Sequence, residues 1–188
     1  MSELQNFRRI GRIDPAAALR ELDRRPELWS LITVRQDYEG SAHRDTESIF
    51  LRGPTTLDDV FNNMEAVDYE SLDELPATFD LVVRASRMLQ AREVGRLMLV
   101  KLHAGGHITP HVDEGRYAEH FARFHLVLTS SPGCRFLAGG EQVVMAPGEL
   151  WWFNHRVQHE VRNGGGERIH LILDMTAPGY TGALGVPA

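Results

Sequence analysis

Three side chains in the second half of the chain could hold a catalytic metal. His111 and Asp113 are separated by one residue, and His159 follows much later. Two histidines and one carboxylate are the ligands of the facial triad in non-haem iron sites, which leaves coordination positions open. Open positions are typical of a catalytic metal, because a structural site closes its shell with protein atoms. The order of these residues therefore predicts iron bound by His111, Asp113 and His159.

A His-x-Asp motif alone is weak support, because such pairs are frequent by chance and usually form hydrogen bonds on a surface strand. Arg168, on the strand predicted after His159, strengthens the hypothesis. Its guanidinium binds a carboxylate bidentately, and an unpaired buried arginine is costly. A dicarboxylate co-substrate would supply the anion and chelate iron through a keto-acid end. The alternative is that Arg168 pairs with a buried acidic residue, for which Asp174 is the candidate.

Two similar segments, Arg123-Phe-His125 and Arg168-Ile-His170, place an arginine and a histidine two residues apart. Because side chains alternate along a strand, each pair shares one face. Two such strands with inward polar residues are typical of a double-stranded β-helix.

The elements around these residues are predicted to be mainly strands. From residue 96 onward, short apolar runs and turn residues recur about every 8 to 12 residues, which indicates a sandwich or barrel. The predicted strands are 96–102, 108–111, 124–128, 134–138, 142–145, 150–154, 159–162 and 169–175. The expected fold class is mainly β with flanking helices, a double-stranded β-helix of the jelly-roll, cupin-like type.

Residues 1–95 are predicted to support this barrel with helices and strands. We expect helices over 16–24, from 56 to 64 and from 76 to near 95, strands over 29–34 and 48–51, and a solvated acidic loop over 65–74. The helix from 56 is expected because Leu57, Val60, Phe61 and Met64 have helical spacing. The predicted organisation is one domain over 1–188, with a catalytic core over 96–176 and a tail over 177–188.

Composition bounds the function classes. The formal net charge is −6 with no basic cluster, which argues against nucleic acid and anionic membrane as partners. The single Cys134 cannot form an internal disulfide, and no long apolar segment is present. We therefore expect a cytoplasmic protein whose Cys134 packs in the core.

The stretch from about Leu97 to Met175 resembles the aspartyl/asparaginyl β-hydroxylase family of iron(II)- and 2-oxoglutarate-dependent dioxygenases, and also bacterial proline cis-hydroxylases. The resemblance rests on residues 101–111, the segment Arg123-Phe-His125-Leu, residues 147–154 and 158–161, and Arg168, with residues 43–49 as an N-terminal family segment. One departure is Asp113, where the animal enzyme of the family has glycine. The triad of this chain is therefore expected to be complete.

The resemblance implies a role for each of these residues. It assigns iron(II) to His111 and His159, the distal carboxylate of 2-oxoglutarate to Arg168, and its iron-side carboxylate to the neighbourhood of Arg123 and His125. The implied reaction uses O2 and hydroxylates an unactivated C–H bond, with release of succinate and CO2.

The substrate is expected to be a small amino-acid-like molecule or an Asp/Asn-type side chain in a peptide. Its contacts are expected from residues 35–52 and 114–121, because loops on a rigid scaffold usually carry recognition. The alternative function is that of a non-catalytic cupin-like protein that binds a metal or a small ligand.

Overall fold

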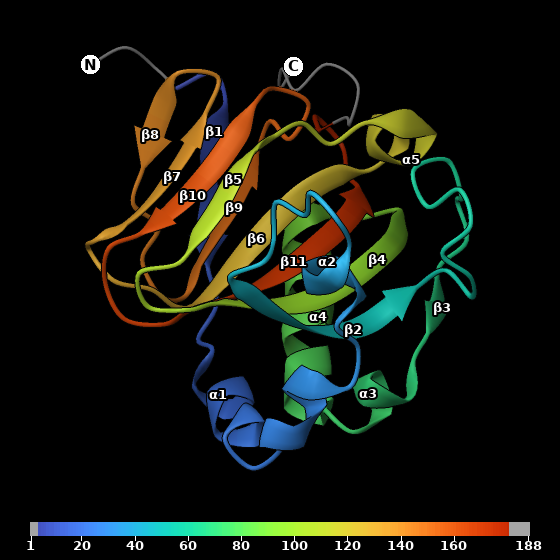
Figure 1. The fold of residues 1–188 in the computed structure, drawn as a ribbon. Coiled ribbons are helices and arrows are strands. Elements are labelled where there is room, and N and C mark those ends of the chain that lie inside the picture. Colours follow the sequence, from blue (N-terminus) through green and yellow to red (C-terminus); the bar gives the residue numbers. More distant parts are fainter. Residues whose placement is uncertain (1–3, 181–188) are drawn as a thin grey trace.

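The computed structural model describes residues 4–180, which form two antiparallel sheets packed against each other (Figure 1). The larger sheet has the strand order β1-β9-β6-β11-β4-β2-β3, and the smaller has the order β5-β10-β7-β8. The strands are β1 (Phe7–Arg12), β2 (Thr46–Gly53), β3 (Val67–Asp68), β4 (Glu93–Leu102), β5 (His107–His111), β6 (Ala122–Thr129), β7 (Cys134–Ala138), β8 (Glu141–Val143), β9 (Glu149–Phe153), β10 (His159–Asn163) and β11 (Arg168–Thr176). This architecture confirms the predicted mainly β, jelly-roll class, and every strand predicted beyond residue 95 has a counterpart.

Strand β11 shows how the sheets enclose polar side chains. Successive residues of a strand point to opposite faces. Leu171 and Leu173 belong to the core under the helices. Arg168, His170 and Asp174 are equally buried but lie on the opposite face, toward the smaller sheet. The predicted sharing of one face by Arg168 and His170 is confirmed.

Two helices cover the outer face of the larger sheet, α1 (Ala16–Leu22) and α4 (Pro76–Leu89) (Figure 1). Their apolar residues join those of β4, β6 and β11 in the main core. The Glu21 carboxylate of α1 accepts hydrogen bonds from the N–H groups of Ala77 and Thr78, at 2.8 and 2.9 Å. These contacts satisfy free donors at the start of α4 and fix it against α1.

The strand predicted over residues 29–34 is wrong. The chain there forms a 3-10 helix, η1 (Pro26–Ser30), followed by the short helix α2 (Val34–Asp37). Pro26 favours a helical start because its φ is fixed, and Leu28 and Trp29 of η1 are buried in the core. These apolar residues are therefore buried from a helical turn and not from a strand.

The helix predicted over residues 56–64 is also wrong, since this segment consists of turns. Asp59 has a φ of 48°, which interrupts a right-handed helix. Leu57 and Phe61 are 54% and 63% exposed, so the expected buried stripe does not pack on a sheet. Instead, Arg96 holds the segment by donating to the carbonyl oxygens of Val60 and Asn63 at 2.7 and 2.8 Å.

Other differences lie at the margins of predicted elements. Strand β1 and helix α5 (Gly115–His120) were not predicted, and the acidic segment contains β3 and α3 (Glu70–Asp73) instead of only a loop. Helix α4 ends at Leu89, where Gln90 has a φ of 51°, and not near Gly95. Cys134 is buried between the sheets, as expected for a packing residue.

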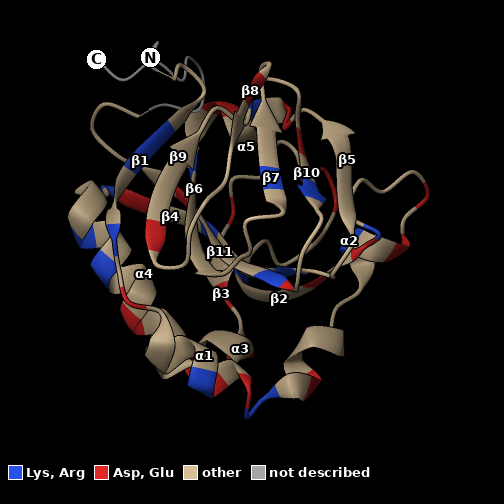
Figure 2. Cartoon of the chain, turned by 90° about the vertical axis from the view of Figure 1, so that its left-hand side faces the viewer, with Lys and Arg blue, Asp and Glu red and all other residues tan. Residues whose placement is uncertain are grey.

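No helix within residues 4–180 is long and apolar enough to cross a membrane. Basic and acidic residues are distributed over many helices and strands (Figure 2).

Of the predicted tail, residues 181–188 lie outside the described residues, and Ala177 and Tyr180 form an isolated β-bridge.

Candidate metal centre and adjoining cavity

Strands β5 and β10 bring the two predicted histidine ligands together. The strands pair antiparallel with His111 opposite His159, and the two ring centroids lie 4.2 Å apart. Asp113 follows two residues after His111, just beyond the end of β5. One potential ligand atom from each of the three residues lies within 4.8 Å of the others. The strand register thus assembles a two-histidine, one-carboxylate group that could hold one metal ion.

Backbone carbonyl groups set the tautomer of both imidazoles. Nδ1 of His111 lies 2.7 Å from the carbonyl oxygen of Thr109, and Nδ1 of His159 lies 3.0 Å from that of Val157. Because a carbonyl oxygen only accepts, each Nδ1 carries the proton and each Nε2 keeps its lone pair. Burial lowers the pKa of His159 to about 4, so this imidazole is neutral at pH 7. Both rings are therefore prepared to act as metal ligands through Nε2.

Asp113 is kept ionised by Arg123. Burial opposes its ionisation, but the Arg123 guanidinium and the neighbouring imidazoles hold the Asp113 pKa well below its usual range. Nη1 of Arg123 donates to Asp113 Oδ2 at 2.6 Å. A negative carboxylate with a fixed orientation is the form that a metal ligand requires.

Arg123 also makes a bidentate ion pair with Asp174. Its Nε and Nη2 donate to the two carboxylate oxygens at 2.8 and 2.9 Å, and Arg123 lies opposite Asp174 in the register of β6 and β11. Asp174 is 2% exposed. The alternative in which Asp174 pairs with Arg168 is therefore wrong. Three of the five N–H donors of Arg123 are already bound to protein carboxylates.

Arg168 is a buried cation without an anionic partner among residues 4–180. It is 1% exposed, and no carboxylate oxygen of the described chain lies within 4.0 Å of its guanidinium. Its Nη2 donates to Nδ1 of His170 at 2.7 Å, and its guanidinium lies 5.7 Å from the Phe136 ring centroid. Burial lowers its pKa to about 10, so it still carries its charge at pH 7. Such a site is suited to an anionic ligand, because an unpaired buried charge is costly.

His125 lies in the Arg168 cluster and not beside the Arg123 ion pairs. Its Nδ1 is 3.1 Å from Nδ1 of His170 and 3.4 Å from Nη2 of Arg168. Burial, reinforced by Arg168, holds the pKa values of His125 and His170 well below the ordinary value, so both rings are neutral. Nε2 of each ring is buried without a hydrogen-bond partner in the described structure. Orphaned polar atoms around an unpaired cation fit a polar ligand such as a dicarboxylate.

A cavity of about 590 Å³ adjoins the metal centre. Asp113 and Arg123 form part of its wall, and the turn over residues 53–61 forms another part. The segments 35–52 and 114–121, from which substrate contacts were expected, both contribute to the wall, with Arg35 and Tyr117 among their residues. Residues 53–61 were not predicted to line a cavity, because the helical spacing of apolar residues such as Phe61 indicated a buried helix face.

The other histidines near the metal centre have different surroundings. His103, His107 and His120 lie at carboxylates of Glu residues, and the buried His155 contacts the carbonyl oxygen of Ala118. His43 differs, because its ring centroid is 5.0 Å from that of His111 and it lines the cavity.

Comparisons with known proteins give a family match and a set of similar folds. The family profile described as aspartyl/asparaginyl beta-hydroxylase matches residues 35–178. A search of curated proteins finds no match.

Solved structures share the fold at low sequence identity. A prolyl hydroxylase from Trichoplax adhaerens, in complex with a hypoxia-inducible factor peptide, is 12% identical with a TM-score of 0.62, covering 92% of this chain and 84% of its own. A 2OG-Fe(II) oxygenase-family oxidoreductase from Burkholderia pseudomallei is 18% identical with a TM-score of 0.55, covering 90% and 82%. A prolyl-4-hydroxylase from Pseudomonas putida is 16% identical with a TM-score of 0.50, covering 92% of both chains.

Proposed function

Because the chain belongs to the aspartyl/asparaginyl β-hydroxylase family, we propose that it is an iron(II)- and 2-oxoglutarate-dependent dioxygenase that hydroxylates an unactivated C–H bond of an amino-acid-like substrate. The observation that carries the proposal is the assembly of His111, Asp113 and His159 with ligand atoms within 4.8 Å. Donors of this type suit non-haem iron(II), and three protein ligands leave room for a co-substrate.

In this proposal His111, Asp113 and His159 hold iron(II). The carbonyl groups of Thr109 and Val157 keep the two Nε2 atoms free for the metal. Arg123 keeps Asp113 ionised and oriented through its 2.6 Å contact. Bound iron(II), 2-oxoglutarate and O2 supply the chemistry that converts a C–H group to C–OH with release of succinate and CO2.

Arg168 is proposed to bind the distal carboxylate of 2-oxoglutarate, with His125 and His170 beside it. The support is the burial of Arg168 without a counter-anion, together with the two orphaned Nε2 atoms. The rings of Phe136 and Phe153 pack against this cluster. The further role proposed for Arg123, near the iron-side carboxylate of 2-oxoglutarate, would have to use its two remaining N–H donors.

The substrate is proposed to be a small amino-acid-like molecule or an Asp/Asn-type side chain of a peptide. The cavity beside Asp113 is the place where such a molecule would reach the metal.

Anaerobic spectroscopy tests the metal and co-substrate assignments. Protein mixed with iron(II) and 2-oxoglutarate without O2 should develop the visible charge-transfer band of a chelated keto acid. His159→Ala should abolish the band, because one of three protein ligands is lost. His103→Ala is the matched control and should retain it, since its half-exposed side chain lies outside the metal group.

A normal band in His159→Ala would remove His159 from the site. Succinate formation under O2, screened with amino acids and short peptides, then separates a hydroxylase from a protein that only binds a metal or small ligand.

A further inference from the structure

Four arginines line the cavity beside the metal centre, and they differ in their protein partners. Arg123 is held by two carboxylates, and Arg52 is paired with Asp68. Arg96 is held by Nη2, which donates to two backbone carbonyl groups, while its Nε is buried without a hydrogen-bond partner in the described structure. Arg35 makes a single side-chain hydrogen bond within residues 4–180, so most of its donors remain available to a ligand.

Arg35 is half-buried, and its Nη1 donates to the Ser48 hydroxyl oxygen at 3.1 Å. No carboxylate of residues 4–180 lies within 4.0 Å of its guanidinium. Burial and the nearby charge of Arg123 lower its pKa to about 10, so the group remains cationic at pH 7. An arginine with free donors on a cavity wall is suited to bind a carboxylate, because its planar fork matches both oxygens.

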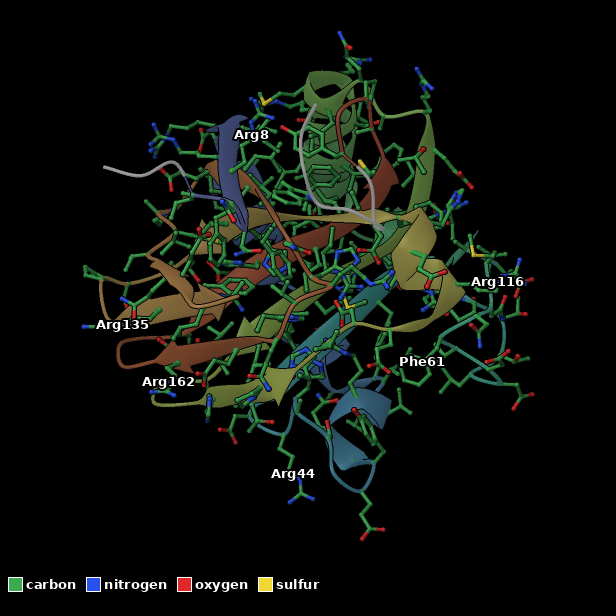
Figure 3. All side chains as sticks on the ribbon, turned by 90° about the horizontal axis from the view of Figure 1, so that it is seen from above. Arg8, Arg44, Phe61, Arg116, Arg135 and Arg162 are labelled. Carbon is green, nitrogen blue, oxygen red and sulfur yellow. The ribbon has the colours of Figure 1, made fainter. Side chains whose placement is uncertain are left out.

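The rest of the cavity wall is largely apolar. Its side chains include Val34, Phe50, Val60, Phe61, Met98 and Tyr117. Phe61 is 63% exposed, and Figure 3 shows it on the side of the molecule that lies between α2 and α5. Large apolar side chains left exposed around a cavity mark a binding surface.

The size of the cavity favours a ligand larger than a free small amino acid. Cavities of roughly 300 to 1,000 Å³ bury ligands of drug size. The volume of about 590 Å³ lies in this range, and a molecule as small as free aspartate or proline would not fill it. Burying the apolar wall of the cavity against an apolar ligand is favourable, at about 25 cal/mol per Å².

We propose that the cavity binds a carboxylate joined to a bulky apolar body, with the carboxylate on Arg35 and the apolar body against Phe50, Phe61 and their neighbours. Calling this ligand the substrate rests on the proposed hydroxylase function, whereas the binding itself does not. Within the amino-acid-like substrates proposed above, the proposal favours those that carry a carboxylate on a bulky apolar body.

Calorimetric titration of the protein tests the proposal without any turnover. The probes are octanoate and 4-phenylbutyrate, as a linear and an aromatic carboxylate, with butyrate and uncharged octanamide as matched probes. Octanoate or 4-phenylbutyrate should bind clearly more tightly than butyrate and octanamide, because only these two combine the charge with a large apolar body.

Two variants assign the binding to the cavity. Whichever of octanoate and 4-phenylbutyrate binds wild type more tightly should bind Arg35→Gln roughly 10- to 150-fold more weakly, because a charge-assisted contact is lost. Arg44→Gln is the matched control, since it removes the same charge from an exposed side chain that points into solvent (Figure 3), and it should bind normally. Phe61→Ser should weaken the two bulky acids but not butyrate, and its exposed position spares the core.

Several outcomes would overturn the proposal. They are failure of both bulky acids to bind, equal binding by octanamide, and unchanged binding by Arg35→Gln. Competitive displacement of octanoate by 2-oxoglutarate would also overturn it, because Arg35 would then be the co-substrate anchor. The proposed hydroxylase function fails separately, through absence of the charge-transfer band in protein that binds the acids normally.

Discussion

At the scale of single residues, the two similar arginines have opposite electrostatic surroundings. Arg123 is enclosed by the carboxylates of Asp113 and Asp174, whereas Arg168 has no carboxylate partner in the described chain. Replacing either arginine therefore tests a different physical effect.

Loss of Arg123 should destabilise the protein, whereas loss of Arg168 should not. Arg123→Leu leaves the buried Asp174 without its partner, and breaking a buried ion pair costs about 3 to 5 kcal/mol. Arg168→Leu leaves no buried carboxylate behind and removes an unpaired charge, so the free energy of unfolding should be unchanged or higher. Urea unfolding of the unliganded variants checks this. A larger loss of stability in Arg168→Leu than in Arg123→Leu would contradict the partner assignment.

Replacement of Arg168 should also weaken the binding of 2-oxoglutarate. In Arg168→Gln the affinity for 2-oxoglutarate should fall by roughly 30- to 1,000-fold, because about 2 to 4 kcal/mol of charge-assisted binding is lost. The contact is far from the reacting atoms, so the effect should fall on affinity more than on kcat. Arg168→Lys should recover only part, because an ammonium lacks the fork. An unchanged apparent affinity in Arg168→Gln would show that the co-substrate anchor lies elsewhere.

At the scale of elements, β6 and β11 place two neutral imidazoles beside a permanent cation. His125 and His170 face each other across these paired strands, and burial, together with Arg168, lowers both pKa values. In the unfolded chain each imidazole has its ordinary pKa, near 6.5. Below that pH the unfolded state binds protons that the native state does not bind. The contribution of the two neutral imidazoles to the free energy of unfolding is therefore present above pH 6.5 and is lost as the pH falls.

The expected pH effect is about 1.4 kcal/mol per pH unit for each such imidazole. His170→Gln removes one of them, so the decline of its unfolding free energy between pH 6 and 5 should be shallower by about that amount. Urea unfolding of the unliganded protein at several pH values measures the decline. Between pH 7.5 and 8.5 the imidazoles are neutral in both states, so wild type and variant should run parallel there. Equal slopes below pH 6 would show that His170 is protonated in the native state.

At the scale of the whole molecule, the metal centre would link strands β5 and β10, which carry His111 and His159, to Asp113 in the segment after β5. A metal that binds only the folded state stabilises it by about 2.7 kcal/mol at 100 times its Kd. For a domain of this length, that energy corresponds to a rise in Tm of roughly 5 to 11 °C. Thermal unfolding with redox-stable Mn(II) should show this rise in wild type and little or none in Asp113→Ala. The full rise in Asp113→Ala would place the carboxylate outside the metal's ligands.

The amino-acid sequence by itself determined the strand-rich half of the molecule and the donor set of the metal centre. Period-two alternation is a local property, so β4 to β11 could be predicted without knowing their partners. The types and order of His111, Asp113 and His159 likewise limited the chemistry before their distances were known. The N-terminal elements were harder, because apolar residues such as Trp29 and Phe61 fit strand, helix or cavity wall equally well until their neighbours are in place.

Only the tertiary structure decided which charges meet. Asp174 could have served either arginine, and the register of β6 against β11 places it opposite Arg123. That register leaves Arg168 unpaired, and it brings His125 from the expected Arg123 site to the Arg168 cluster. The cavity wall was also hidden, because it unites α2, the turn over 53–61 and α5, which are distant in sequence. Strand register and cavity shape depend on packing between distant segments, and no local pattern encodes that packing.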